Sequence, residues 1–508
     1  MTGETPCAVG EVSGGQVTRV GRGKRMSKKR KIALFAAGGL FALLILAVVA
    51  PVLFVDVNAH KPRLEAAASD ALGMEVRIGG KLGIGLFPGF HVTLEDVRIR
   101  NRGSDVASAK ETILGIELLP LLHKEVRIVK IGMKRPRISI EQDRDGKFNF
   151  ETPEEEAGKK TAEEDKGTRF SLDVKKISLS DGALYYADKK TGEVLEAGDF
   201  NLDVSRLRLT GGRSSDLLKT LSFAAEFACK EFRKGSLAVS NLKLHIEGKD
   251  GVLDLNPVTM RLFGGQGSGS LRADLSGSVP HYHVRYSLSG FRIEEFLKAL
   301  SPKKVAEGSM DFSSSLSTQG KTMNEIKRNA NGEVSLRGEN LTLDGVDLDR
   351  TFSRYEASQS FNLVDVGAFF FAGPFAPLIT KGYNFGSLFL GTGGSSRIRA
   401  LVSDWKVERG IARAKDVAMA TGENRIALTG SLDFVNERFN DVAVAMVDGK
   451  GCAKVRQKIR GPFQKPEVEK ASVLQSAAGP LLNLFKQAGK LFGGPCEVFY
   501  SGSVAPPN

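Results

Sequence analysis

The sequence predicts a mainly β protein with a single N-terminal transmembrane helix and a long antiparallel sheet curled into a groove. Three observations lead to this fold class. Residues 32–55 form an uncharged apolar run, residues from 74 onward alternate between apolar and polar side chains, and the helical segments between them are few and short. Alternation with a period of two is typical of strands that have one buried face and one solvated face.

The apolar run at residues 32–55 is long enough to cross a bilayer, which takes about 20 apolar residues in a helix. A cleaved signal peptide is the alternative, but it has a shorter apolar core and a small-residue cleavage site. Here the run continues through residues 51–55, past Ala47 and Ala50, which favours an uncleaved anchor. The side chains expected to face lipid are Ile32, Leu34, Phe35, Leu40, Phe41, Leu44, Leu46, Val49, Leu53 and Val55.

Basic residues lie just before this run and predict that the N-terminus stays in the cytoplasm while residues from 56 onward are exported. The residues expected to set this topology are Arg25, Lys28, Lys29, Arg30 and Lys31. The first 31 residues carry +6 of the +13 net charge, which leaves only +7 for the rest of the 508-residue chain. So mild an excess does not indicate nucleic-acid binding. Residues 1–25 are polar and glycine-rich, and Met26 is a natural start, so this segment is either a cytoplasmic tail or lies before the true start.

The exported part divides into two strand-rich regions separated by a charged loop. Residues 56–150 begin with a short helix near 62–73 and continue as strands. Residues 151–168 contain no large apolar side chain, so we expect a mobile solvated loop. Strands resume in the central region, 169–348, and we expect 25 to 35 short strands in all at the usual spacing.

The C-terminal third is predicted to contain an apolar helical hairpin and a last β region. Residues 349–390 change to a helical and then apolar pattern, but the run at 363–379 contains Asp365 and two prolines and is short for a membrane span. We expect a broken hairpin that packs on the sheet or enters a membrane interface. Residues 391–508 return to strands and include an amphipathic helix near 480–492.

Four cysteines are present, and their spacing does not match a metal site. Cys7 is expected in the cytoplasm. Cys452 and Cys496 bracket the C-terminal segment and are the expected disulfide in an oxidising compartment. Cys229 is left single in an apolar strand, where a buried thiol is expected.

No pattern in the sequence predicts catalysis, a cofactor or a metal. The glycine-rich segment 264–270 is followed by a strand, whereas a phosphate-binding loop is followed by a helix. His281 and His283 share a strand face but have no third ligand motif nearby. We therefore expect a protein that is not an enzyme.

The strands have one apolar face, and the few helices are too short to cover it. A sheet that curls into a trough would leave an apolar cleft, and beside a membrane an acyl chain is the natural ligand. A series of ordinary sandwich domains is the alternative, which periodicity does not exclude. The residues predicted to line the groove are Ile78, Ile84, Val92, Leu94, Ile99, Ile138 and Ile140.

Short segments in a characteristic order make the chain resemble the AsmA family of envelope proteins, from residue 26 almost to the end. Their specificity lies in that order and not in any chemical motif. The segments include EVRIGGKL (75–82), LFPG (86–89), LEDVRI (94–99), KFNF (147–150), LFGGQGSG (262–269), YHVRY (282–286), LTLDGVDL (341–348) and IRGPFQKPEV (459–468). The basic tail before Met26 and the apolar hairpin depart from the family pattern.

The resemblance implies a single-pass protein of the bacterial inner membrane with its bulk in the periplasm, related to bridge-like lipid-transfer proteins. It implies that inner-membrane phospholipids are the partners, moved between the inner and outer membranes in support of outer-membrane biogenesis. The alternative is a non-transporting scaffold, or a regulator of outer-membrane protein assembly and targeting to the membrane, with envelope proteins as partners. An envelope enzyme is the third and weakest hypothesis. Nucleic acid is not an expected partner.

Overall fold

The computed structural model describes residues 57–87, 89–122, 127–151, 171–210, 217–300, 306–345, 347–350, 393–469, 472–473, 496 and 498–507. The predicted anchor, its basic flank and the terminal helix lie outside these residues, and so do nearly all of the charged loop and the apolar hairpin. The chain divides after Ala59 into two units, and the second, which begins at His60, contains the sheet. Among the described helices, none has the length and apolar character needed to span a membrane.

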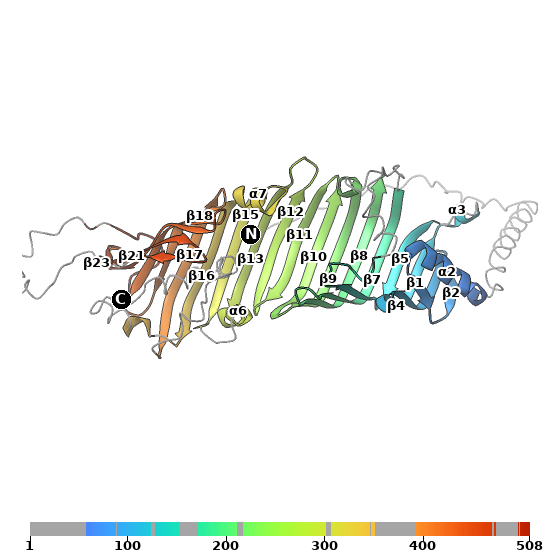
Figure 1. The fold of residues 1–508 in the computed structure, drawn as a ribbon, viewed down its shortest axis with the longest axis horizontal. Coiled ribbons are helices and arrows are strands. Elements are labelled where there is room, and N and C mark those ends of the chain that lie inside the picture. The colour runs from blue at the N-terminus through green and yellow to red at the C-terminus, as the bar shows by residue number, and fades with distance from the viewer. Residues whose placement is uncertain are drawn as a thin grey trace, which may run out of the picture. The chain divides into compact units, whose positions relative to one another are not determined.

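Within the described residues, 23 strands form one sheet, so the predicted mainly β class is confirmed (Figure 1). The first strands are β1 (Glu75–Ile78), β2 (Leu82–Gly85), β3 (His91–Asn101), β4 (Ser104–Ile116), β5 (Ile128–Lys134), β6 (Arg137–Gln142), β7 (Ser171–Asp188) and β8 (Glu193–Thr210). The central strands are β9 (Leu221–Lys234), β10 (Leu237–Lys249), β11 (Val252–Leu262), β12 (Gly265–Asp274), β13 (His281–Arg292), β14 (Ala306–Glu307), β15 (Ser309–Gln319) and β16 (Asn331–Asp344). The last strands are β17 (Ser395–Glu408), β18 (Ile411–Ala420), β19 (Arg425–Asp433), β20 (Arg438–Val447), β21 (Ala453–Pro462), β22 (Glu467–Val468) and β23 (Ser472–Val473).

Most strands pair antiparallel with a neighbour in sequence, but the sheet is mixed, which corrects the purely antiparallel prediction. β5 and β6 both run parallel to β7. Their registers with β7 have the same offset, so they are two halves of one strand line, interrupted at Pro136, which has no N–H to donate. The connection between β6 and β7 spans residues 143–170, long enough to return the chain to the same end of the sheet, as a parallel pairing requires.

Several strands are longer than the alternation predicted. β7 runs unbroken for 18 residues, through positions where the alternation of apolar and polar side chains is interrupted. The apparent breaks are β-bulges, such as the register shift between Leu179 and Gly182, where Asp181 has a φ of 54°. A bulge inserts one residue, so the apolar positions shift by one in sequence but remain on one face of the sheet. The prediction of short strands is wrong for β7, because it treated the segments between bulges as separate strands.

The described helices are few and short, as predicted. They are η1 (Val57–His60), α2 (Lys61–Leu72), α3 (Leu118–Leu122), α5 (Leu217–Thr220), α6 (Ile293–Leu300) and α7 (Met323–Arg328). Helix α2 lies along the edge strand β1, where Glu65 Oε1 accepts the Ile78 N–H at 2.6 Å and Ser69 Oγ accepts the Val76 N–H at 2.8 Å. These oxygens stand where the carbonyls of another strand would be, so α2 closes this edge.

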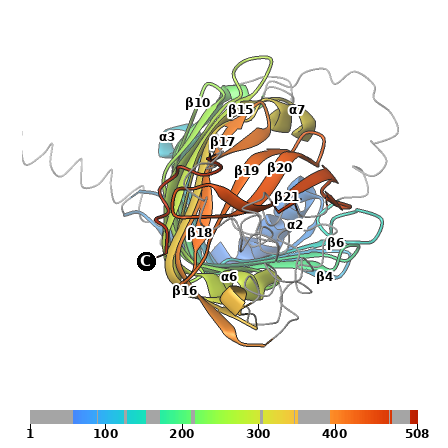
Figure 2. The same ribbon diagram turned by 90° about the vertical axis from the view of Figure 1, so that its left-hand side faces the viewer.

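The main core lies toward the C-terminal end of the sheet. Its fully buried side chains come from β16–β21, and include Ile398, Trp405, Ile426 and Leu432. Figure 2 shows the reason, because β19–β21 turn toward the inner side of the arc made by the earlier strands. The C-terminal end of the sheet thus covers its own apolar face, and the earlier strands do not receive this cover.

Candidate functional site

A continuous row of mostly apolar residues crosses the sheet from β2 to β18, and we call it the midline row. Each member is the register partner of the next on the neighbouring strand, so all lie on one face, about 4.8 Å apart. The row consists of Leu82, Leu94, Thr112, Met133, Leu179, Leu202, Phe227, Leu244, Val258, Gly269, Tyr286, Ser314, Val334, Trp405 and Ala414. We call the side of the sheet that carries this row the apolar face.

All seven predicted groove residues lie on the apolar face. Ile99 pairs with Ala107 on β4, and Ala107 pairs in turn with Ile138 on β6, so Ile99 and Ile138 lie on the same face. In the same way Ile78 pairs with Val97, Ile84 with Val92, and Ile140 with Tyr186. Ile78 is buried and the other six are half-buried. The structure therefore places on one surface residues that lie up to 62 positions apart in sequence.

The predicted groove residues stop at β6, so most of the apolar face was not predicted. Leu202, Phe227, Leu244 and Tyr286 occupy the same face on later strands and are half-buried. The alternation that marks them is visible in the sequence. Their common face is not, because bulges within β7 to β11 shift the alternating positions.

The opposite face of the sheet is charged and exposed. Ion pairs connect neighbouring strands there, for example Lys134 Nζ to Glu111 Oε1 at 2.8 Å and Arg272 Nη1 to Asp254 Oδ2 at 3.4 Å. Pairs this exposed stabilise a fold by about 0–1 kcal/mol each. Their main effect is to make this face soluble, so the sheet is amphipathic across its thickness.

The exposure of the midline row changes along the sheet. From Met133 to Ser314 its members are half-buried, while Val334 and Trp405 are only 5% and 1% exposed. Most of the main core comes from β16 and later strands, although Leu288 and Phe291 of β13 and Met310 of β15 are also part of it. The apolar face is thus partly open before β16 and filled by the protein's own side chains after it.

The C-terminal segment, residues 498–507, covers part of the opposite face at this end of the sheet. Tyr500 and Val504 pack on small side chains of β18–β20, including Ala418, Ala427 and Ala445. A disulfide joins Cys452 to Cys496 just before this segment. Cys229 is a free, buried thiol on β9, and burial raises its pKa.

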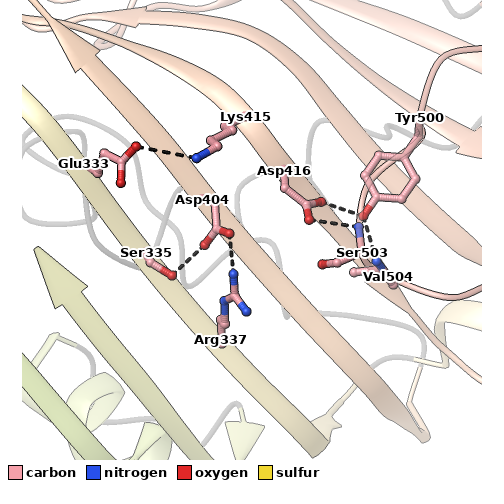
Figure 3. A network of polar contacts seen from close by, with 9 residues as sticks. All are labelled: Glu333, Ser335, Arg337, Asp404, Lys415, Asp416, Tyr500, Ser503 and Val504. Carbon is pink, nitrogen blue, oxygen red and sulfur yellow. Dashed lines mark hydrogen bonds and ion pairs between the residues drawn. The ribbon is translucent and has the colours of Figure 1, made fainter.

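A polar network holds the segment in place (Figure 3). Asp416 accepts hydrogen bonds from Tyr500 Oη at 2.6 Å and from the Ser503 N–H at 2.9 Å. Burial disfavours the charged carboxylate, but these hydrogen bonds outweigh it and hold the pKa of Asp416 below its usual range. Burial also raises the pKa of Tyr500, and so does its hydrogen bond to Asp416.

One of two comparisons with known proteins assigns this chain to a family. The AsmA family model matches residues 26–212 and 214–416. The chain belongs to the AsmA family. The family match contains the whole midline row, from Leu82 to Ala414, and ends before the C-terminal segment. The comparison with curated proteins found no match.

Proposed function

We propose that this AsmA-family protein binds phospholipids by their acyl chains on the apolar face and moves them between the inner and outer membranes of a bacterial envelope. This activity would support outer-membrane biogenesis. The observation that carries the proposal is the midline row, which is continuous across the strands and half-exposed from Met133 to Ser314.

Half-exposed apolar side chains in such a row favour a long, flexible, apolar ligand. Apolar surface removed from water contributes roughly 25 cal/mol per Å², and an exposed apolar area of this extent in a native protein marks a ligand or partner site. An acyl chain can cover successive row members without needing hydrogen-bond partners. The head group would stay in water beyond the strand ends, and the charged opposite face would keep the protein soluble.

The proposed location is the inner membrane, with residues 32–55 as a single span, the N-terminus in the cytoplasm and the bulk in the periplasm. The uncharged run and its basic N-terminal flank support this topology. The disulfide between Cys452 and Cys496 suits an oxidising compartment. The proposed function involves binding and movement only, with no chemical step.

A charge placed on the midline row tests the proposal. Leu94→Asp puts a carboxylate on the apolar face of β3, whereas Thr93→Asp puts the same group one residue away on the opposite face. We expect Leu94→Asp to lose co-purifying phospholipid, measured by mass spectrometry, and to slow transfer of fluorescent phospholipid between vesicles. Thr93→Asp should behave as the wild type in both assays.

Thermal unfolding must show that both variants are folded. A folded Leu94→Asp protein with wild-type lipid content and transfer would contradict the proposal. A folded wild-type protein that carries and transfers no lipid would favour the scaffold alternative, which predicts a protein partner instead.

A further inference from the structure

The apolar face is open over only part of its length. Three strand-to-strand steps lead along the midline row from Tyr286 to Trp405, through Ser314 on β15 and Val334 on β16. At about 4.8 Å per strand this is roughly 14 Å. Over that short distance the row passes from half-buried to 1% exposed.

The closed part is filled by well-packed side chains of the protein itself. Beside Trp405 on the same face lie Leu336 and Leu401, with exposed fractions of 5% and 1%. The Trp405 indole N–H donates a hydrogen bond to Ser403 Oγ at 2.8 Å, so the polar atom of the tryptophan is satisfied within the core. Protein cores of this kind have few voids larger than a water molecule. An acyl chain could enter only by displacing these side chains.

Two aromatic side chains lie at the boundary. The rings of Tyr286 on β13 and Phe312 on β15 are 6.3 Å apart, and β15 is the neighbour of β16. The Tyr286 ring lies over glycines of β12, so close that a Cβ at Gly267 would be 2.5 Å from its hydroxyl oxygen. The missing side chains at Gly267 and Gly269 thus leave a space that the Tyr286 ring occupies.

We propose that the surface along which acyl chains bind, the lipid track, ends at the Tyr286–Phe312 pair. The track is blind there, which means that it has no exit toward the C-terminal end of the sheet. Acyl chains occupy the apolar face along the midline row from Met133 on β5 to Ser314 on β15 and do not pass along β16–β21. Lipid therefore leaves this part of the sheet over its free strand ends and not through its C-terminal end. This inference rests on the proposed lipid-binding function.

The single tryptophan of the chain, Trp405, provides the test without any substitution. The full-length protein is reconstituted with phosphatidylethanolamine whose acyl chains are brominated, because bromine quenches tryptophan fluorescence only at close contact. We expect Trp405 emission to be the same in brominated and unbrominated lipid. Phe227→Trp adds a tryptophan to the open part of the row, and its added emission should be mostly lost in the brominated lipid.

A matched control separates the two faces. His245 follows Leu244, the row partner of Phe227, and lies on the opposite face of β10. The added emission of His245→Trp should be unaffected by bromine. The Phe227→Trp variant is also made with Trp405→Phe, so that the emission of the tryptophan at position 227 is measured by itself. The version that keeps Trp405 is used if the double variant does not fold.

Each outcome decides the matter. Quenching at residue 227 without quenching at Trp405 supports the blind track. Quenching of Trp405 as strong as at residue 227 overturns it but leaves lipid binding intact. No quenching at residue 227, or equal quenching at residue 245, overturns lipid binding on the apolar face and the blind track with it.

Discussion

Tyr500 donates a hydrogen bond to Asp416 at 2.6 Å, although 84 positions separate the two residues. The same hydroxyl accepts the Val504 N–H at 2.9 Å. Asp416 is the register partner of Asp404 on the neighbouring strand, so two carboxylates face each other there. Each carboxylate has its own hydrogen-bond donors (Figure 3). Asp404 accepts hydrogen bonds from Ser335 and Arg337, whereas Asp416 accepts its hydrogen bonds from the C-terminal segment. The C-terminal segment lies beyond the family match, which ends at residue 416. Its hydrogen bonds are nevertheless required to compensate the carboxylate of Asp416, which lies within the match.

The Tyr500→Phe variant should lose about 1–3 kcal/mol of stability, the range for a buried group left without its partner. It removes the donor to Asp416 and the acceptor of the Val504 N–H while keeping the ring on its alanine-lined patch. Denaturant unfolding measures the loss, and limited proteolysis should show earlier cleavage at the C-terminal end. Tyr185→Phe, on an exposed tyrosine, serves as control, and an equal effect there would contradict the assigned role of Tyr500.

The contribution of Asp416 to stability should depend on pH. Its pKa is lower in the folded protein than the value of about 3.9 expected in the unfolded chain. Its stabilising effect is therefore complete above about pH 4 and is lost as the pH falls through the lower folded pKa. Thermal unfolding of wild type and Asp416→Asn from pH 7 to pH 3 should show a difference in Tm that shrinks in acid. A constant difference would mean that the carboxylate charge is not what stabilises this contact.

Reduction of the disulfide should destabilise the C-terminal end of the sheet. The bond closes a loop with a sequence separation of 44 residues, for which about 2–4 kcal/mol is typical. A reducing agent should lower the Tm of the wild type and have no effect on a Cys452→Ser/Cys496→Ser double variant. Cys229 should not react with thiol reagents in the folded protein, because it is only 2% exposed. A reducing-agent effect that persists in the double variant would point to another cause.

Equal truncations should cost different amounts in the two parts of the apolar face. Leu428→Ala, at a 2% exposed position, should cost about 2–5 kcal/mol, as in other cores. Leu202→Ala, at a half-buried position on the midline row, should cost clearly less, because water or lipid can fill the space. Chemical unfolding of both variants in lipid-free detergent makes the comparison. Equal losses would show that the face before β16 is packed as tightly as the core.

The amino-acid sequence by itself determined that this protein is mainly β and that its strands have one apolar face. Alternation such as that of Val76 and Ile78 with their charged neighbours is a local property, so it is readable without knowledge of the fold. The family was also recognisable, because its short segments keep their order along the chain.

Only the tertiary structure decided which strands face each other and which part of the apolar face is covered. Leu202 and Val334 alternate with polar neighbours in the same way, yet Leu202 is half-buried and Val334 is buried. The parallel pairing of β5 and β6 with β7, the bulges that keep Leu179 and Gly182 on one face, and the bond from Tyr500 to Asp416 depend equally on distant segments. Burial depends on which segments pack over a residue. The strands that cover the apolar face, β19–β21, begin more than two hundred residues after Leu202 in the chain.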